Sequence, residues 1–543
     1  MEKKDPSHPI AKKQQHSYSI HEKTITDDYF WLRDKDNPDV IAYLEAENNY
    51  TKTMLKHTSS FQTVLFEEMK ARIKEDDISA PENTDSHQYY SRNWKGKQYK
   101  SYHRKSLKIQ EAPEELLLDE NELVKGHDFI KLGVFKISPN ERYLAYSVDL
   151  DGSEEFTLYV KDLETGELLS DQIKNTSYYF EWFDNSNFYY ATLSPIKQPD
   201  KVFKHRIGTD SQKDDLIYHE SDERFYLSLR KSHDKNFLFI ELSSHGNSTE
   251  VYFLGLNSSD QVFRLIQIRQ PKLEYYPEHQ NGRFLLRTNQ GGATNFKIME
   301  TPVGNPSIEN WTELVPHRPA VMIQNFDVFL NRLVLFEREN GLRTIHIINR
   351  ETQVDHYITF PEAVYTALPP ELLVHPKYDT NILRFQYTSM ITPPSVYDYD
   401  MDSKSLMLVK ETEIPSGYIK EDYTTERVGA TASDGTKIFI SLVYPKGLVK
   451  NGKNNLLLYG YGSYGYSIDP QFNPSRLSLL NRGMVYAIAH IRGGGEMGRP
   501  WYDDGKLLKK MNTFTDFIAC AEYLIEEKYT SPEHLVAMGG SAG

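Results

Sequence analysis

The feature that most constrains the fold is a repeat in the middle of the chain. A turn followed by a strand of aromatic and aliphatic residues recurs in RNWKGKQYKSY, SPNERYLAYSV, FDNSNFYYATL, SHDKNFLFIEL, HQNGRFLLRT, FLNRLVLFER and KYDTNILRFQY. The turns lie near Asn93, Asn140, Asn185, Asp234, Asn281, Leu330 and Asp379. Their spacing of roughly 45 to 49 residues is typical of four-stranded propeller blades. We therefore predict a seven-bladed β-propeller over residues 77–415, with an irregular all-β region of evenly spaced turns as the alternative.

The segment before the propeller is predicted to be helical. In NPDVIAYLEAENNYTKTML, the residues Val40, Ile41 and Leu44 have the spacing of an amphipathic helix, and SFQTVLFEEMKARIK predicts a second helix. The polar, proline-containing segment EDDISAPENTDS that follows is typical of a domain boundary. We assign residues 1–76 to an N-terminal helical segment.

After the propeller the pattern becomes that of an α/β domain. NNLLLYGYG and GMVYAIAHI are nearly continuous apolar runs, which are typical of parallel strands buried on both faces. Thr513 and Asp516 have the spacing of a capping box that starts a helix. The apolar stripe expected on this helix consists of Phe514, Phe517, Ile518, Ala521, Leu524 and Ile525. Because HLVAM then returns to a short strand, we assign residues 416–543 to the N-terminal part of an α/β-hydrolase domain.

The residues Gly539–Gly543 read GGSAG and match the pattern G-x-S-x-G. In α/β-hydrolases this motif places a serine in a strained turn between a strand and a helix, where small flanking residues allow the backbone to fold tightly. The strand HLVAM directly before Ser541 supplies that context, so we predict a nucleophile rather than a glycine-rich loop. The backbone N–H of Ala542 is then an expected oxyanion donor, and a second donor is expected from the loop after NNLLLYGYG.

A serine hydroxyl is a poor nucleophile unless a base lies beside it. In this fold the acid and the histidine follow the serine in the sequence, and Ser541 is followed by only Ala542 and Gly543. None of the 18 histidines is a good candidate for the base, and we interpret His490 as a strand residue. We therefore expect an incomplete hydrolase domain that lacks a triad, exposes core surface and is inactive by itself.

Two further motifs lie close to the predicted site. The segment Gly493–Gly498 matches the dinucleotide fingerprint G-x-G-x-x-G, but RPWYDDG follows where that fold requires a helix. We interpret it as a tight loop beside the site, with Arg492 and Glu496 paired. For most of the tyrosines around YGYGSYGY, packing at a domain interface is the favoured interpretation; they are Tyr459, Tyr461, Tyr464 and Tyr466.

Composition narrows the classes of function. The balance of 63 basic and 77 acidic residues, a net charge of -14, disfavours nucleic acid as a partner and favours cationic ligands. No apolar stretch approaches the length of a membrane span, and the first residues lack the apolar core of a secretory signal, so a cytoplasmic location is expected. Cys520 is the only cysteine, and the His and Asp residues lack ligand spacing, so we expect no metal or organic cofactor.

Three long motifs resemble the prolyl oligopeptidase family of serine peptidases: YGYGSYGYSIDPQF, HIRGGGEMGRPWYDDGKLLKKMNTFTDF and YTSPEHLVAMGGSAG. Within that family they are most similar to the oligopeptidase B branch, which cuts after Lys and Arg. DDYFWLRD near the N-terminus fits the same family. The resemblance implies a seven-bladed propeller that caps an α/β-hydrolase domain, with the N-terminal segment packed on the hydrolase domain.

The resemblance also implies roles for individual residues. Ser541 would form an acyl-enzyme that water hydrolyses, and Tyr461 would donate its hydroxyl to the oxyanion together with the Ala542 N–H. Asp469 matches a carboxylate that helps hold basic side chains of the substrate, whereas Gln471 stands where relatives can carry a second acid. The expected substrates are short, basic peptides, which the propeller separates from folded proteins. The alternatives are a prolyl-specific or acylaminoacyl peptidase of this family, and a propeller that binds peptides or proteins without catalysis.

Overall fold

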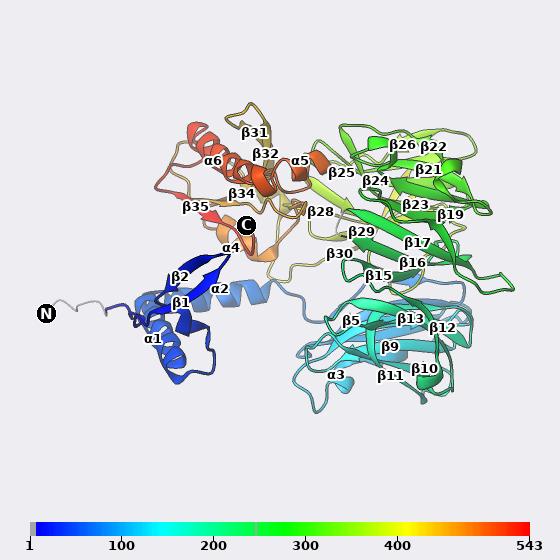
Figure 1. Cartoon of the computed structure of the whole chain (residues 1–543). Coiled ribbons are helices and arrows are strands. Elements are labelled where there is room, and N and C mark those ends of the chain that lie inside the picture. Colours follow the sequence, from blue (N-terminus) through cyan, green and yellow to red (C-terminus); the bar gives the residue numbers. More distant parts are fainter. Residues whose placement is uncertain (1–6, 245–246) are drawn as a thin grey trace. The chain divides into compact units, whose positions relative to one another are not determined.

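The structure is a computed structural model that describes residues 7–244 and 247–543 (Figure 1). It divides into two compact units, Met1–Ile73 and Lys74–Gly543. The first unit contains a hairpin and the two predicted helices: β1 (His16–Ile20), β2 (Lys23–Asp27), α1 (Pro38–Met54) and α2 (Ser59–Ala71). Helix α1 begins after Asn37, whose Oδ1 accepts the N–H of Asp39, and Pro38 occupies the first position, where no N–H is needed.

The second unit begins with a β-propeller made of six antiparallel sheets. The first sheet contains β3 (Asp77–Ile78), β4 (Glu82–Asn83), β5 (His87–Asn93), β6 (Lys100–Ser106) and β7 (Glu115–Asp119). The second sheet has seven strands: β8 (Lys131–Ile137), β9 (Tyr143–Asp149), β10 (Phe156–Asp162), β11 (Leu168–Trp182), β12 (Asn187–Leu193), β13 (Pro199–Arg206) and β14 (Asp215–His219).

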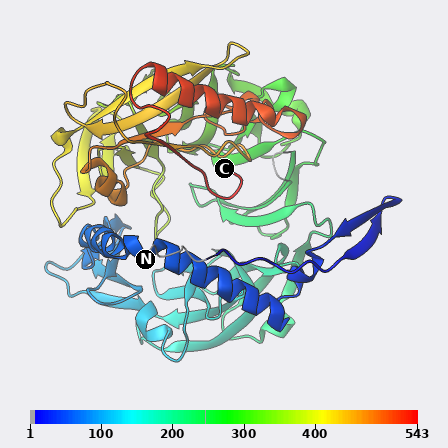
Figure 2. The same ribbon diagram turned by 90° about the vertical axis from the view of Figure 1, so that its left-hand side faces the viewer.

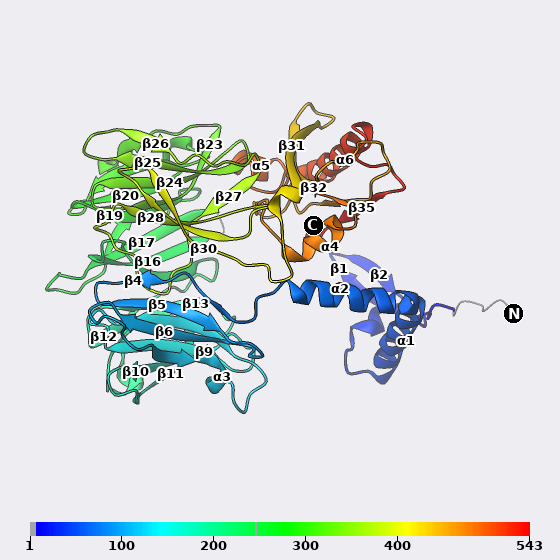
Figure 3. The same ribbon diagram turned by 180° about the vertical axis from the view of Figure 1, so that it is seen from behind.

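The other four propeller sheets have four strands each. They are β15 (Tyr226–Lys231), β16 (Phe237–Ser244), β17 (Ser248–Gly255) and β18 (Arg264–Gln267); β19 (Tyr275–Gln280), β20 (Arg283–Thr288), β21 (Lys297–Pro302) and β22 (Thr312–Val315); β23 (Val321–Val328), β24 (Arg332–Glu339), β25 (Leu342–Asn349) and β26 (Asp355–Tyr357); and β27 (Tyr365–Leu368), β28 (Ile382–Ser389), β29 (Ser395–Asp400) and β30 (Ser405–Glu411). The last two of these sheets contact each other through β25 and β27 (Figure 3).

The prediction of seven separate blades is wrong. Five sheets stand as separate blades, and the strands expected to form two further blades make one continuous sheet of seven strands. The cause is β11, which is 15 residues long: its first part pairs with β10, its second part pairs with β12, and the two pairings meet at Thr176. The turns near Asn140 and Asn185 keep the spacing of the repeat, but turn spacing does not reveal whether a strand continues from one sheet into the next.

The apolar residues of the propeller strands pack between neighbouring sheets. In β10, the side chains of Phe156, Leu158 and Val160 are buried, and the residues between them are partly exposed. This alternation follows from the two-residue period of a strand, which sends successive side chains to opposite faces. The sequence pattern of short alternating strands therefore predicted the class of this region correctly, although it predicted the wrong number of blades.

The second unit ends with a five-stranded sheet in the order β31-β32-β34-β33-β35. Its strands are β31 (Tyr423–Thr431), β32 (Lys437–Pro445), β33 (Leu456–Tyr459), β34 (Val485–Ala489) and β35 (Leu535–Met538). Strand β33 runs parallel to both β34 and β35, as the apolar runs predicted. The side chains of β33 and β34 that face the core, among them Leu456, Leu458 and Val485, are fully buried.

Helix α6 (Met511–Glu526) lies across this sheet and contacts β31 and β32 (Figure 2). The capping-box prediction is wrong, because the helix begins at Met511 and the Thr513 hydroxyl donates to Arg492 O at 2.7 Å. The predicted apolar stripe is also only partly buried: Leu524 is buried, whereas Phe514 and Ile518 are exposed. On the edge strand β35, Val536 and Met538 are each 53% exposed.

Candidate active site

Ser541 lies in a sharp turn directly after β35. Its φ is 55°, in the left-handed region that residues with a side chain rarely adopt. The Gly543 N–H donates to Gly540 O at 2.8 Å and closes the turn, and Ser541 itself is exposed. Strained backbone of this kind persists where the surrounding structure enforces it, and it is concentrated at functional sites.

The glycines around Ser541 are required by close backbone contacts. A Cβ atom on Gly539 would lie 2.6 Å from the carbonyl carbon of Gly543, and one on Gly543 would lie 2.9 Å from Gly460 O. A Cβ atom on Gly540 would meet no atom within 4 Å. The motif therefore has a steric basis at its two outer glycines, as the sequence pattern predicted, and none at the glycine directly before the serine.

Tyr461 lies beside this turn. Its Cδ2 would be 3.1 Å from a Cβ atom on Gly543, and the preceding Gly460 N–H donates to Met538 O at 3.2 Å. In the described part of the chain, neither the Tyr461 hydroxyl nor the Ala542 N–H has a hydrogen-bond partner. The Tyr461 ring thus lies beside the Ser541 turn, and both predicted oxyanion donors are free to donate; their role in an oxyanion hole stays a prediction.

The loop that carries Tyr461 is held by α6 and the residue before it. The Lys510 ammonium donates to Gly462 O at 2.6 Å and to Ser463 Oγ at 2.7 Å, and burial lowers the pKa of this lysine. Gly462 has a φ of 65°, and a Cβ atom there would lie 2.5 Å from Thr513 Cγ2. Sequence reasoning missed the supporting role of Lys510, because a lysine in KLLKK has no motif that points to a loop 48 residues earlier.

The glycine-rich segment after β34 packs against the same loop. A Cβ atom on Gly493 would lie 2.1 Å from Gly462 O, and the Gly465 N–H donates to Gly493 O at 3.0 Å. This close backbone contact explains the glycines as parts of a tight loop. The predicted pairing of Arg492 with Glu496 is wrong, because Arg492 instead binds two other carboxylates, those of Asp516 and Asp434.

Asp469 is engaged in a buried ion pair with the propeller. Its two carboxylate oxygens accept hydrogen bonds from Arg338 at 2.6 Å and from Arg343 at 2.8 Å. Burial alone would raise the pKa of the Asp469 carboxyl, but the charges of the two arginines lower it below the ordinary value. The sequence could not identify these partners, which lie more than a hundred residues away in β24 and β25. Both oxygens of Asp469 are thus engaged with the propeller, and its contact with a basic side chain of a substrate stays a prediction.

One serine–histidine pair is present in this domain, but it is buried. Ser441 Oγ and His490 Nε2 lie 2.7 Å apart, and His490 Nδ1 lies 3.9 Å from a Glu496 carboxylate oxygen. All three residues are buried, with Ser441 fully inaccessible, so a substrate cannot reach the hydroxyl. Among residues 7–244 and 247–543, no histidine forms a hydrogen bond with Ser541.

A cleft of about 680 Å³ lies between the loop of Tyr464 and the propeller. Its C-terminal-domain wall includes Tyr464, which is 77% exposed and has a φ of 58°, and Tyr502. On the propeller wall, the Arg287 guanidinium lies over the rings of Tyr276 and Phe296, at 4.3 and 4.2 Å from their centroids. Aromatic and cationic side chains thus line both walls of this cleft, with Arg499 as the cation on the wall of the C-terminal domain.

Two properties of the whole described chain bear on its function. None of its helices in residues 7–244 and 247–543 has the length and apolar character needed to cross a membrane. Within the same residues, no group of three or more His, Cys, Asp or Glu side chains is arranged to hold a metal ion.

Comparison with known proteins gives the same family at both ends of the chain. Residues 8–412 match the model described as "Prolyl oligopeptidase, N-terminal beta-propeller domain", and residues 470–543 match "Prolyl oligopeptidase family". Dipeptidyl aminopeptidase BI of Pseudoxanthomonas mexicana is 39% identical, over 98% of this chain and 76% of the relative. Protease 2 of Moraxella lacunata is 36% identical, over 98% of this chain and 77% of the relative. The solved structure of oligopeptidase B from Leishmania major has a TM-score of 0.90 and 32% identity, over 99% of this chain and 79% of that one.

Proposed function

Because the chain belongs to the prolyl oligopeptidase family of serine peptidases, and is similar to oligopeptidase B within it, we propose that Ser541 is the nucleophile of a peptidase that hydrolyses short peptides. The observation that carries the proposal is the turn after β35. There an exposed serine with a φ of 55° lies next to the unpaired N–H of Ala542. A hydroxyl in this position can attack a peptide carbonyl while the adjacent N–H binds the developing oxyanion.

In the proposed mechanism, a base takes the Ser541 hydroxyl proton while Oγ bonds to the carbonyl carbon. The C–N bond then breaks, and the amine leaves with that proton as the acyl-enzyme forms. The Tyr461 hydroxyl and the Ala542 N–H each donate a hydrogen bond to the carbonyl oxygen as it becomes negative. Water then hydrolyses the ester and frees Ser541. Both donors lack partners in the described chain, so they need not break an existing hydrogen bond to bind the oxyanion.

We also propose that the 543-residue chain alone reacts slowly. The attack requires a base to take the serine proton, and no histidine of the described residues forms a hydrogen bond with Ser541. A fluorophosphonate probe tests both statements. The chain should be labelled slowly and only at Ser541, and the Ser541→Ala variant should not be labelled. Rapid stoichiometric labelling of the 543-residue chain would contradict the account of the base.

For specificity, we propose cleavage after Lys or Arg, supported by the similarity to oligopeptidase B and by the net charge of -14. Asp469 is not the residue we assign to this preference, because Arg338 and Arg343 already occupy its carboxylate. Chromogenic peptides that end in Arg, Lys or Pro before the chromophore test the preference. Faster hydrolysis of the Pro substrate would indicate a prolyl-specific enzyme instead.

A second candidate is an exopeptidase that removes dipeptides, which is favoured by the 39% identity with dipeptidyl aminopeptidase BI. The two candidates differ in whether the substrate needs a free amino terminus. Matched peptides with free and acetylated amino termini separate them: equal rates indicate an endopeptidase, and loss of cleavage on acetylation indicates the exopeptidase. Cleavage of the acetylated peptide alone indicates an acylaminoacyl peptidase. From the sequence, we propose that the reaction takes place in the cytoplasm.

A further inference from the structure

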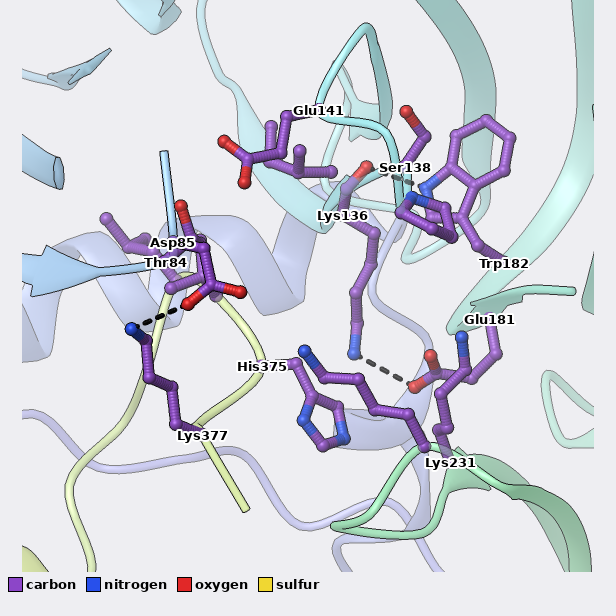
Figure 4. Close-up of a pocket in the computed structure, with 15 residues that line it drawn as sticks. Thr84, Asp85, Lys136, Ser138, Glu141, Glu181, Trp182, Lys231, His375 and Lys377 are labelled. Carbon is purple, nitrogen blue, oxygen red and sulfur yellow. Dashed lines mark hydrogen bonds and ion pairs between the residues drawn. The ribbon is translucent and has the colours of Figure 1, made fainter. Parts of the chain in front are cut away.

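A cavity of about 240 Å³ lies within the propeller and is lined by residues from five separate segments (Figure 4). Four lysines contribute to its wall: Lys136, Lys231, Lys235 and Lys377. They come from the end of β8, the end of β15, the turn after β15 and the loop between β27 and β28. Three carboxylates, those of Asp85, Glu141 and Glu181, also line the cavity, so the lysines exceed the acids by one.

Two of these lysines lack a counter-ion. Lys136 Nζ donates to Glu181 at 2.9 Å, and Lys377 lies 2.8 Å from Asp85, as the dashed lines in Figure 4 show. In the described part of the chain, the ammonium groups of Lys231 and Lys235 have neither a hydrogen bond nor an ion pair. Burial lowers the pKa of both. An anion in the cavity would give these two ammonium groups the direct partner that they lack.

The remaining polar groups of the lining are held by other partners and form no hydrogen bond or ion pair with Lys231 or Lys235 in the described part of the chain. The Glu141 carboxylate already accepts hydrogen bonds from His87 at 2.6 Å and from the Tyr89 hydroxyl at 2.9 Å. Burial lowers the pKa of His375 to about 3, so its imidazole is neutral and adds no charge. Asp85 is 94% exposed, so its pairing with Lys377 is a weak surface interaction.

The other walls of the cavity are apolar and held in place. Trp182, Leu373 and Val374 line it, and the Trp182 Nε1–H donates to Lys136 O at 3.0 Å. The N–H groups of Leu373 and Val374 donate to the Glu82 carboxylate at 2.7 and 3.0 Å, which fixes the loop that carries them. In a ligand with an anionic group and a small organic part, the anionic group could contact the lysines and the organic part could contact this apolar wall.

We propose that this cavity binds a phosphate group, either inorganic phosphate or a small phosphomonoester, with the ammonium groups of Lys231 and Lys235 as its main ligands. Lysine is a common phosphate ligand and binds as a point charge. A phosphomonoester carries about two negative charges at pH 7, whereas a carboxylate carries one, so phosphate matches two ammonium groups better. The residues described as lining the cavity include no arginine. Phosphate is therefore the anion that fits the donors better.

The phosphate site lies at the end of the propeller away from the candidate active site. Cavity residues lie in the β8–β9 and β15–β16 connections, which join the first and second strands of their sheets. The ion pair with Asp469 is made at the β24–β25 connection, which joins a second and a third strand. In antiparallel sheets these two kinds of connection lie at opposite ends of the strands. Phosphate binding can thus be tested independently of Ser541.

The test is calorimetric titration of the full chain with inorganic phosphate at constant ionic strength. We expect saturable binding of one phosphate per chain, weakened about tenfold for each lysine removed and about a hundredfold in Lys231→Met/Lys235→Met. The control is Lys446→Met/Lys453→Met, which removes two exposed lysines of the C-terminal domain and should leave the affinity unchanged. Absence of saturable binding, or equal affinity in the two double variants, would overturn the proposal.

Three further titrations test the proposal in other ways, with a Glu181→Gln variant, a phosphomonoester and acetate. Glu181→Gln frees Lys136 from its ion pair and should tighten phosphate binding, so a gain is available if the methionine variants fold poorly. A phosphomonoester such as glycerol phosphate should bind more tightly than inorganic phosphate if the apolar wall is used, and equally if the anion alone is recognised. Acetate at the same ionic strength should bind far more weakly than phosphate, and equal binding of acetate would refute the assignment.

Discussion

The Arg338 guanidinium donates a hydrogen bond of 2.6 Å to the Asp469 carboxylate, and this buried pair joins β24 of the propeller to the C-terminal domain. The Asp469 side chain is 6% exposed and that of Arg338 is 1% exposed. Arg343 binds the second carboxylate oxygen at 2.8 Å. When one partner of a buried ion pair is removed, the other charge stays in a medium that solvates it poorly. The carboxylate is therefore a structural link between the two domains of this unit.

Asp469→Asn should lower the free energy of unfolding by about 3–5 kcal/mol, because it leaves two arginines near a neutral amide. Urea unfolding of the variant measures this change. The control is Asp503→Asn, which breaks the exposed pair with Lys506 and should change stability by less than about 1 kcal/mol. Unchanged stability together with a large rise in KM for basic peptides would show that Asp469 binds substrate instead.

Tyr461→Phe should reduce kcat about 100-fold, because it removes one of two oxyanion donors. KM should change little, since the hydroxyl acts on the transition state. Tyr464→Phe on the same loop is the matched control, because Tyr464 is exposed and does not lie beside Gly543. Equal kcat values for the Tyr461→Phe variant and the unaltered enzyme would remove Tyr461 from the mechanism.

Gly539→Ala should abolish fluorophosphonate labelling, because its Cβ atom would lie 2.6 Å from the Gly543 backbone and force the turn open. Gly540→Ala changes the next residue in the same way but places its Cβ atom in open space. Labelling rates of the two variants should therefore differ by at least about tenfold. Similar rates would show that the Ser541 turn does not depend on the tight contact between Gly539 and Gly543.

Stability should fall as the pH rises from about 6.5 to about 9, because of His205 in the propeller. Its ring nitrogens lie 2.8 Å from carboxylate oxygens of Asp171 and Asp214. Burial by itself would lower the pKa of His205, but the two acids raise it to about 9. Since the folded pKa lies above the unfolded one, the stabilisation is complete below about pH 6.5 and is lost through pH 9, with a size of roughly 3 kcal/mol.

Urea midpoints between pH 6 and pH 10 measure the pH effect. His205→Gln should be less stable than the unaltered protein at pH 6. Its urea midpoint should fall much less than that of the unaltered protein as the pH rises above 6.5. His219→Gln removes a partly exposed histidine on the neighbouring strand β14 and should leave the decline in place. A pH profile that His205→Gln leaves unchanged would mean that other groups cause the decline.

Local patterns predicted the elements around the candidate site well. The apolar runs that became β33 and β34 needed no distant partner, because residues buried on both faces give a continuous apolar sequence. The same holds in part for the turn at Ser541: Gly539 is required by its contact with Gly543 four residues later, whereas Gly543 is required by its contact with Gly460 in the loop after β33. The roles of Ser541, Tyr461 and Ala542 remain predictions that the experiments above test.

Features that depend on distant parts of the chain were not predictable. The ion pair between Asp469 and Arg338 joins residues 131 positions apart, and nothing in the segment SIDPQF indicates this partner. Lys510, which directly precedes α6, supports the loop that carries Tyr461. The Arg492 side chain binds Asp516 rather than Glu496, although Glu496 is nearer in the sequence. In each case the partner is decided by which elements pack together, and this information is not contained in a short sequence motif.

Because of the long strand β11, one part of the propeller should resist local opening more than the separate blades do. A ring of separate blades can loosen one blade at a time, since each meets its neighbours only through side chains. Here strand pairing links β8 to β14 in one sheet, so we expect the residues between Lys131 and His219 to open together. Backbone amides in this stretch should therefore exchange with similar protection, as one cooperative unit. If the propeller opens, we expect it to open between the separate blades instead.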